Sequence, residues 1–112
     1  MITLVLPLPP SANNLFVNGK RGRFKSSRYK DWEDEADSCL YQQKTGVVVG
    51  KYIVEISVPE MMRGDIDNRS KGVIDFMVGK GITPDDKFLW KVSVERDPSV
   101  EPGWCHVKAR AA

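Results

Sequence analysis

Five polar side chains in the second half of this 112-residue chain have types and spacing that suit chemistry on phosphate. Asp65 and Asp67 are two residues apart, and Lys71 follows four residues later. Asp85 and Asp86 stand together further along. If residue 65 leaves a strand in extended conformation, the first two carboxylates lie side by side, because side chains at i and i+2 share a face. Neighbouring carboxylates repel one another unless a cation joins them, so the pattern indicates a divalent metal site.

Oxygen ligands select hard cations, so Mg²⁺ is the predicted ion and Mn²⁺ a substitute. Such an ion activates water and stabilises negative charge during in-line displacement at phosphorus. Lys71 lies one helical turn beyond Asp67, where its ammonium would neutralise a phosphate or help to orient the water. Asp86 is expected to return beside the first acids after the intervening helix, and Asp85 is expected to have a secondary part.

Other phosphate and metal motifs are missing from the sequence. An EF-hand loop starting at Asp65 would need glycine where Ser70 stands and glutamate where Phe76 stands. No G-x-x-x-x-G-K-[ST] segment is present, so no nucleotide cofactor is predicted. His106 is the only histidine, which excludes a histidine-rich zinc site. Taken singly, Asp67 would suit a helix start and Asp85 a turn, so only their conjunction points to a site.

The net charge of +2 hides a strong segregation of charge along the chain. Residues 1–30 contain six lysines and arginines and no acid, whereas residues 31–37 contain five acids and no base. The acidic run suits the first turns of a helix, where negative charge favours the helix dipole. The basic run is a candidate binding arm for a polyanion. The side chains predicted to contact such a partner are Lys20, Arg21, Arg23, Lys25, Arg63 and Arg69.

Hydrophobic periodicity predicts strands over 2–8, 51–58, 88–96 and 104–109, a hairpin over 15–25, and helices over 28–43 and 68–80. Asn18-Gly19 is the predicted hairpin turn, and Ser26 or Ser27 the predicted cap of the first helix. Alternation in the third strand assigns Phe88, Trp90, Val92 and Val94 to one face. The expected fold is α+β: one domain over residues 1–112, in which two helices pack on a four- to five-stranded mixed sheet.

No apolar stretch is long enough to span a membrane, and no secretory leader precedes the first strand, so a cytoplasmic protein is expected. Cys39 and Cys105 are the only cysteines and are predicted to be buried free thiols.

The acidic motif resembles that of a known family. Asp65-x-Asp67-Asn68-x-x-Lys71, with Asp86 nineteen residues after Asp67, is similar to the RusA family of Holliday-junction resolvases. The opening Pro7-Leu8-Pro9-Pro10-Ser11-x-Asn13-Asn14 and the hairpin segment Arg21-Gly22-Arg23 also resemble that family. The similarity extends over about residues 2–96. One departure is the single Arg63 before the first acid, where family members often carry several arginines.

The resemblance implies Mg²⁺ ligands at Asp65, Asp67 and Asp86, all required for cleavage, and a lysine important for cleavage at Lys71. It also implies a homodimer that nicks a four-way DNA junction symmetrically, in a family common in phages and prophages. Either predicted helix could supply the dimer surface, through Val73, Phe76 and Met77 or through Trp32 and Tyr41. The alternative is a DNA-binding module without catalysis, in which the acids cap helices. A sugar-nucleotide transferase is disfavoured, because the chain has no room for a separate nucleotide-binding domain.

Overall fold

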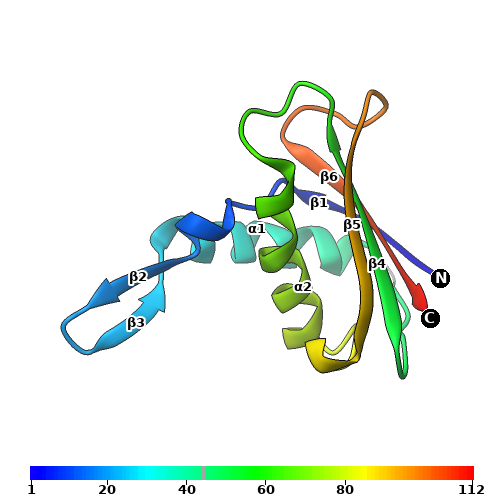
Figure 1. Ribbon diagram of the computed structural model, residues 1–112, viewed down its shortest axis with the longest axis horizontal. Helices are drawn as coiled ribbons and strands as arrows, with labels where there is room; N and C mark the ends of the chain where they lie inside the picture. The colour runs from blue at the N-terminus through cyan, green and yellow to red at the C-terminus, as the bar shows by residue number, and fades with distance from the viewer. Residues whose placement is uncertain (44) are drawn as a thin grey trace.

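A four-stranded mixed sheet with the order β1-β6-β4-β5 forms the centre of the protein in this computed structural model, which describes residues 1–43 and 45–112 (Figure 1). Its strands are β1 (Ile2–Pro7), β4 (Tyr52–Pro59), β5 (Leu89–Asp97) and β6 (Trp104–Ala111). β6 is antiparallel to both of its neighbours, whereas β4 and β5 are parallel. The predicted α+β class and mixed sheet are confirmed.

Two helices cover one face of this sheet (Figure 1). They are α1 (Ser27–Gln42) and α2 (Ser70–Gly79), and a 3₁₀ turn, η2 (Ile66–Arg69), leads directly into α2. Ser26 caps α1, because its hydroxyl accepts a hydrogen bond from the Tyr29 N–H at 3.1 Å. Both helices were predicted, and the second has its first turn wound more tightly than an α-helix.

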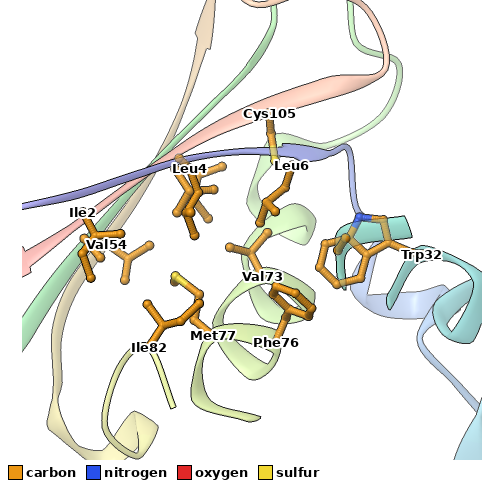
Figure 2. Close-up of a cluster of buried hydrophobic side chains, with 14 of the residues drawn as sticks. Ile2, Leu4, Leu6, Trp32, Val54, Val73, Phe76, Met77, Ile82 and Cys105 are labelled. Atoms are coloured by element: carbon orange, nitrogen blue, oxygen red, sulfur yellow. The ribbon is translucent and has the colours of Figure 1, made fainter. Parts of the chain in front are cut away.

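The core lies between the sheet and the helices (Figure 2). Alternate residues of β1, including Leu4 and Leu6, face Val73 and Met77 of α2. Trp32 of α1 closes one end of this core, where its indole N–H donates to the Pro7 carbonyl at 2.8 Å. Because the core holds α2 by its apolar face, the polar residues at both ends of α2 have fixed positions.

The predicted hairpin is present but turns two residues later than expected. It comprises β2 (Phe16–Gly19) and β3 (Gly22–Lys25), with Lys20 and Arg21 as the turn. Gly22, which has a φ of +109°, supplies the left-handed conformation that the turn needs. The hairpin projects from the body of the molecule (Figure 1).

The predicted alternation along β5 is broken near its start. Leu89 and Val94 both pack against the core although they are five positions apart, an odd spacing that strict alternation would put on opposite faces. A register shift opposite Tyr52 and Ile53 explains this, because Tyr52 pairs with Leu89 and Ile53 with Lys91, leaving Trp90 as the extra residue. The single apolar face predicted for Phe88, Trp90, Val92 and Val94 is therefore wrong.

Three further expectations are corrected. Cys105 is buried as predicted, but Cys39 is only half-buried. The α2 side chains Val73, Phe76 and Met77 belong to the core of one copy, so they offer no dimer surface. On α1, Tyr41 is exposed whereas Trp32 is buried, so these two residues form no common apolar face.

Among the described residues, no helix is both long and apolar enough to cross a membrane.

Candidate active site

The first acid pair lies at the N-terminal end of α2. Asp65 is extended and precedes η2, whereas Asp67 lies inside this 3₁₀ turn. Both side chains are exposed. The predicted extended backbone from 65 to 67 is therefore wrong: a 3₁₀ turn rotates each residue by about a third of a turn, so i and i+2 do not share a face. The two carboxylates still leave the same short segment toward solvent.

The segment before Asp65 is held in place by two arginines. Arg96, near the end of β5, donates to the carbonyls of Glu60, Met62 and Gly64 at 3.0, 2.7 and 3.2 Å. Arg69 of η2 donates to the Arg63 carbonyl at 3.3 Å and to the Pro9 carbonyl at 2.8 Å.

Gly64 completes this support with a φ of +88°, a conformation that favours glycine. The position of Asp65 is thus tied to the end of β5 and to the segment after β1.

Lys71 takes a different partner from the one expected. Its ammonium lies 3.1 Å from a carboxylate oxygen of Asp75, one turn further along α2, and both side chains are partly exposed. Exposed ion pairs of this kind contribute little free energy, so the ammonium of Lys71 can exchange the Asp75 carboxylate for a phosphate. The ion pair makes Asp75 a neighbour of the candidate site, which nothing in the sequence pattern had indicated beyond its i+4 spacing from Lys71.

The second acid pair lies beyond the C-terminal end of α2. Asp86 begins the 3₁₀ turn η3 (Asp86–Phe88), which leads into β5. Asp85 caps η3 by accepting a hydrogen bond from the Lys87 N–H at 3.0 Å, and this bond lowers the pKa of Asp85. The capping bond gives Asp85 a structural task, and its secondary part in a metal site stays a prediction.

Buried hydroxyl groups lie beneath this second pair. Burial raises the pKa of Tyr52, and the nearby carboxylates of Asp86, Asp85 and Asp75 raise it further. The hydroxyls of Tyr52 and Thr83 are both buried, and the contact between them offsets part of this rise in the Tyr52 pKa. The negative charges of three acids therefore act on one buried hydroxyl.

One copy of the chain does not bring the two acid pairs together. The ten residues of α2 separate Asp67 from the turn that carries Asp86, which at about 1.5 Å per residue is roughly 15 Å. Carboxylates that share a Mg²⁺ each lie about 2 Å from it. Over residues 1–43 and 45–112, no three acidic, histidine or cysteine side chains are grouped closely enough to hold a metal. The expected return of Asp86 to Asp65 and Asp67 does not occur within the protomer.

The six predicted polyanion contacts divide into two groups. Lys20 and Arg21 are exposed in the hairpin turn, and Arg63 is exposed beside Asp65. Arg23 is exposed too, with its guanidinium 3.9 Å from the centre of the Phe16 ring.

The remaining two cations already bind other groups of the protein. Lys25 forms an ion pair with Glu33 at 3.0 Å, and Arg69 binds the backbone carbonyls described above. The hairpin turn and Arg63 are therefore the more accessible basic groups among the six.

Comparison with known proteins agrees with the motif. The family model described as Endodeoxyribonuclease RusA matches residues 7–108. The crossover junction endodeoxyribonuclease rusA of Enterobacteria phage HK97 is 26% identical over 107 residues, which cover 93% of this chain and 89% of that protein. The crossover junction endodeoxyribonuclease RusA of Aquifex aeolicus (strain VF5) is 31% identical over 91 residues, which cover 78% of this chain and 71% of that protein.

Proposed function

This chain belongs to the RusA endodeoxyribonuclease family, and from that premise we propose that it resolves four-way DNA junctions by paired, symmetric nicks. The observation that carries the proposal is the match over residues 7–108, a segment that contains both acid pairs and the basic hairpin. The working form is a homodimer, because two strands must be cut together. Its place of action is the cytoplasm of a bacterium, whether from a resident prophage or from an infecting phage.

The proposed cofactor is Mg²⁺, which Mn²⁺ replaces. The residues that would hold it are Asp65, Asp67 and Asp86, since carboxylate oxygens are the donors that this ion prefers. When bound, the ion would supply positive charge that stabilises the five-coordinate phosphorus of the transition state and favours ionisation of the attacking water. A single protomer presents Asp65 and Asp67 at one end of α2 and Asp86 at the other, so it does not by itself assemble this set of three ligands.

The basic residues of the chain hold the DNA. Phosphate contacts from lysine and arginine provide most of the affinity for a nucleic acid. The exposed Lys20 and Arg21 lie at the end of a projecting arm, and Arg63 lies next to the first acid pair. Such an arrangement would contact the phosphates of the DNA backbone rather than the bases. It would therefore recognise the shape of a branched substrate and not its base sequence.

Lys71 acts at the scissile phosphate. Its exposed ion pair with Asp75 orients the ammonium along α2, and a phosphate brought in by DNA would compete with the carboxylate for it. Once the ammonium of Lys71 has exchanged Asp75 for this phosphate, its positive charge lies where negative charge builds up during cleavage.

The separation of the three acids within one copy favours a second candidate function. In that alternative the protein binds branched DNA without cutting it, Asp85 caps η3 and the hairpin provides the affinity. Mg²⁺-dependent nicking of a synthetic junction separates the two functions.

The test is Asp67→Asn, which removes the charge that a metal needs while keeping the size of the side chain. We expect junction binding to persist while nicking with Mg²⁺ falls by at least about 100-fold. Asp31→Asn, an exposed acid on α1, is the matched control and should cleave normally. Normal cleavage by Asp67→Asn would remove this residue from the metal site, and a wild-type protein that binds but never nicks would favour the alternative.

A further inference from the structure

One face of the projecting β2–β3 hairpin is apolar and open to solvent (Figure 1). Cross-strand pairing puts Val17 opposite Phe24, and residues paired in this way share a face of the ribbon. Their side chains are 43% and 52% exposed. Within the described part of the chain, neither belongs to the hydrophobic core or packs against it. The protein therefore presents an apolar pair on the arm that its own residues leave uncovered.

Two glycines keep the ring of Phe24 accessible. Gly19 and Gly22 form the last pair before the turn and lie on the same face as Phe24, so no side chain from these positions covers the ring. The ring also lies directly beside the Gly19 backbone, because a Cβ atom at Gly19 would come within 2.6 Å of the Phe24 Cε1 atom. Glycine at 19 thus gives the ring a place next to the backbone and leaves the rest of it free for contacts outside the protein.

Positive charge surrounds this apolar face. Lys20 and Arg21 are exposed in the turn, and Arg23 lies on the opposite face of the ribbon, where its guanidinium stacks on Phe16. Residues 1–30 contain no acid that would oppose these charges. Such an arm attracts a polyanion and repels a basic partner. DNA fits both features, because its phosphates are negative and each of its bases has a flat face on which an aromatic ring can stack.

From these features, and resting on the proposed function, we infer that the Phe24 ring stacks on the face of a base at the branch point of the DNA. Inside a linear duplex, neighbouring bases cover both faces of each base. Where strands exchange, the stack is interrupted, so a base face is exposed there at lower cost. Stacking tolerates any base sequence. Phe24 would therefore add selectivity for branched DNA, while Lys20 and Arg21 bind phosphates that every DNA carries.

The Val17–Phe24 pair also stabilises the hairpin itself, since an aromatic residue opposite a β-branched one is a favourable cross-strand pair. That structural role needs only a large side chain that favours a strand, whereas stacking on a base needs an aromatic ring. Two substitutions separate the roles: Phe24→Ile keeps a strand-forming side chain without a ring, and Phe24→Tyr keeps the ring.

Binding measured without divalent metal tests the contact in the absence of metal-dependent cutting. We expect Phe24→Ile to lower affinity for a synthetic four-way junction by about 10-fold, and affinity for a linear duplex of the same sequence by less than about 2-fold. The slope of log affinity against log salt concentration should stay that of the wild type, since no phosphate contact is lost. Phe24→Tyr should bind like the wild type. Tyr41→Ile, which removes a 92% exposed ring from α1, is the matched control and should change neither affinity.

Equal losses on junction and duplex, or equal losses in Phe24→Ile and Phe24→Tyr, would overturn the stacking. A changed oligomeric state of Phe24→Ile in light scattering would overturn it too, because the apolar face would then pack between copies. These measurements do not depend on cleavage. If the wild type binds junctions but never nicks them, the proposed nuclease function fails, and the junction affinity of Phe24→Ile still decides the role of the ring.

Discussion

Arg96 and Arg69 both donate hydrogen bonds to backbone carbonyl groups rather than to acidic side chains. Between them the two guanidinium groups fix the segment that leads into Asp65, and Arg96 alone binds the carbonyls of Glu60, Met62 and Gly64. A guanidinium presents several donors in one rigid plane, which suits neighbouring carbonyls better than a lysine would. In a nuclease, Arg96 would be a positioning residue, acting through the backbone that carries Asp65.

Replacing Arg96 should therefore affect both stability and cleavage. We expect Arg96→Ala to lower the free energy of unfolding by about 1–3 kcal/mol, since several charge-assisted hydrogen bonds are lost. Cleavage should fall more than junction binding does. Urea titration and a nicking assay on the same preparation would measure the two effects.

Arg110→Ala is the matched control for that experiment. Its ion pair with Glu55 spans 3.4 Å and is about half exposed, so its loss should change stability by less than about 0.5 kcal/mol. If the two variants were equally stable, the carbonyl contacts of Arg96 would contribute no more to stability than the exposed ion pair of Arg110.

Among the elements, the β2–β3 hairpin is the one that leaves the body of the protein. Its base is fixed by packing, because Phe16 meets the Tyr29 ring edge-on at a centroid distance of 5.8 Å. Its turn carries the exposed Lys20 and Arg21 beyond these contacts. The hairpin is thus built as a fixed base with a charged end.

Removing the charge of the turn should weaken DNA binding in a salt-dependent way. For Lys20→Ala/Arg21→Ala we expect the slope of log affinity against log salt concentration to become shallower by up to about two, close to one per lost phosphate contact. Junction binding measured between low and moderate salt would show it. Lys108→Ala/Arg110→Ala, on β6, provides a charge-matched control, and an equal change in both pairs would contradict a special role for the hairpin.

At the scale of the whole molecule, two buried ionisable groups make the folded protein more stable at neutral than at alkaline pH. Burial raises the pKa of Tyr29 to about 12, with help from the carboxylates of Asp75 and Glu33, and burial also raises the pKa of the Cys105 thiol to about 12. Both groups gain negative charge on losing a proton, and each does so at a lower pH in the unfolded chain. Their contribution to stability is therefore complete below about pH 8.5.

That contribution should be lost as the pH rises toward 12. We expect the free energy of unfolding to decline progressively above about pH 9. Tyr29→Phe should make the decline shallower, whereas the exposed Tyr41→Phe should leave it unchanged. Urea unfolding at a series of pH values gives the measurement, and an unchanged alkaline slope in Tyr29→Phe would show that this hydroxyl is not the cause.

Much of the fold and the chemistry follows from local pattern. The strands, the α1 cap at Ser26 and the helix at 70–79 were predictable because periodicity and capping act over a few neighbouring residues. The family motif likewise depends only on residue types and spacing, so Asp65, Asp67, Lys71 and Asp86 could be chosen without a structure.

What tertiary structure alone decided is where those residues stand relative to one another. The partner of Lys71, the pinning of Asp65 by Arg96 and the shifted register at Trp90 each depend on contacts between distant segments. The distance between the acid pairs depends on the length of α2 and on the direction of β5, because a helix held by its core face keeps its two ends apart. Spacing in the sequence identified the acids, but the packing of α2 against the sheet decides that the two acid pairs lie at opposite ends of this helix.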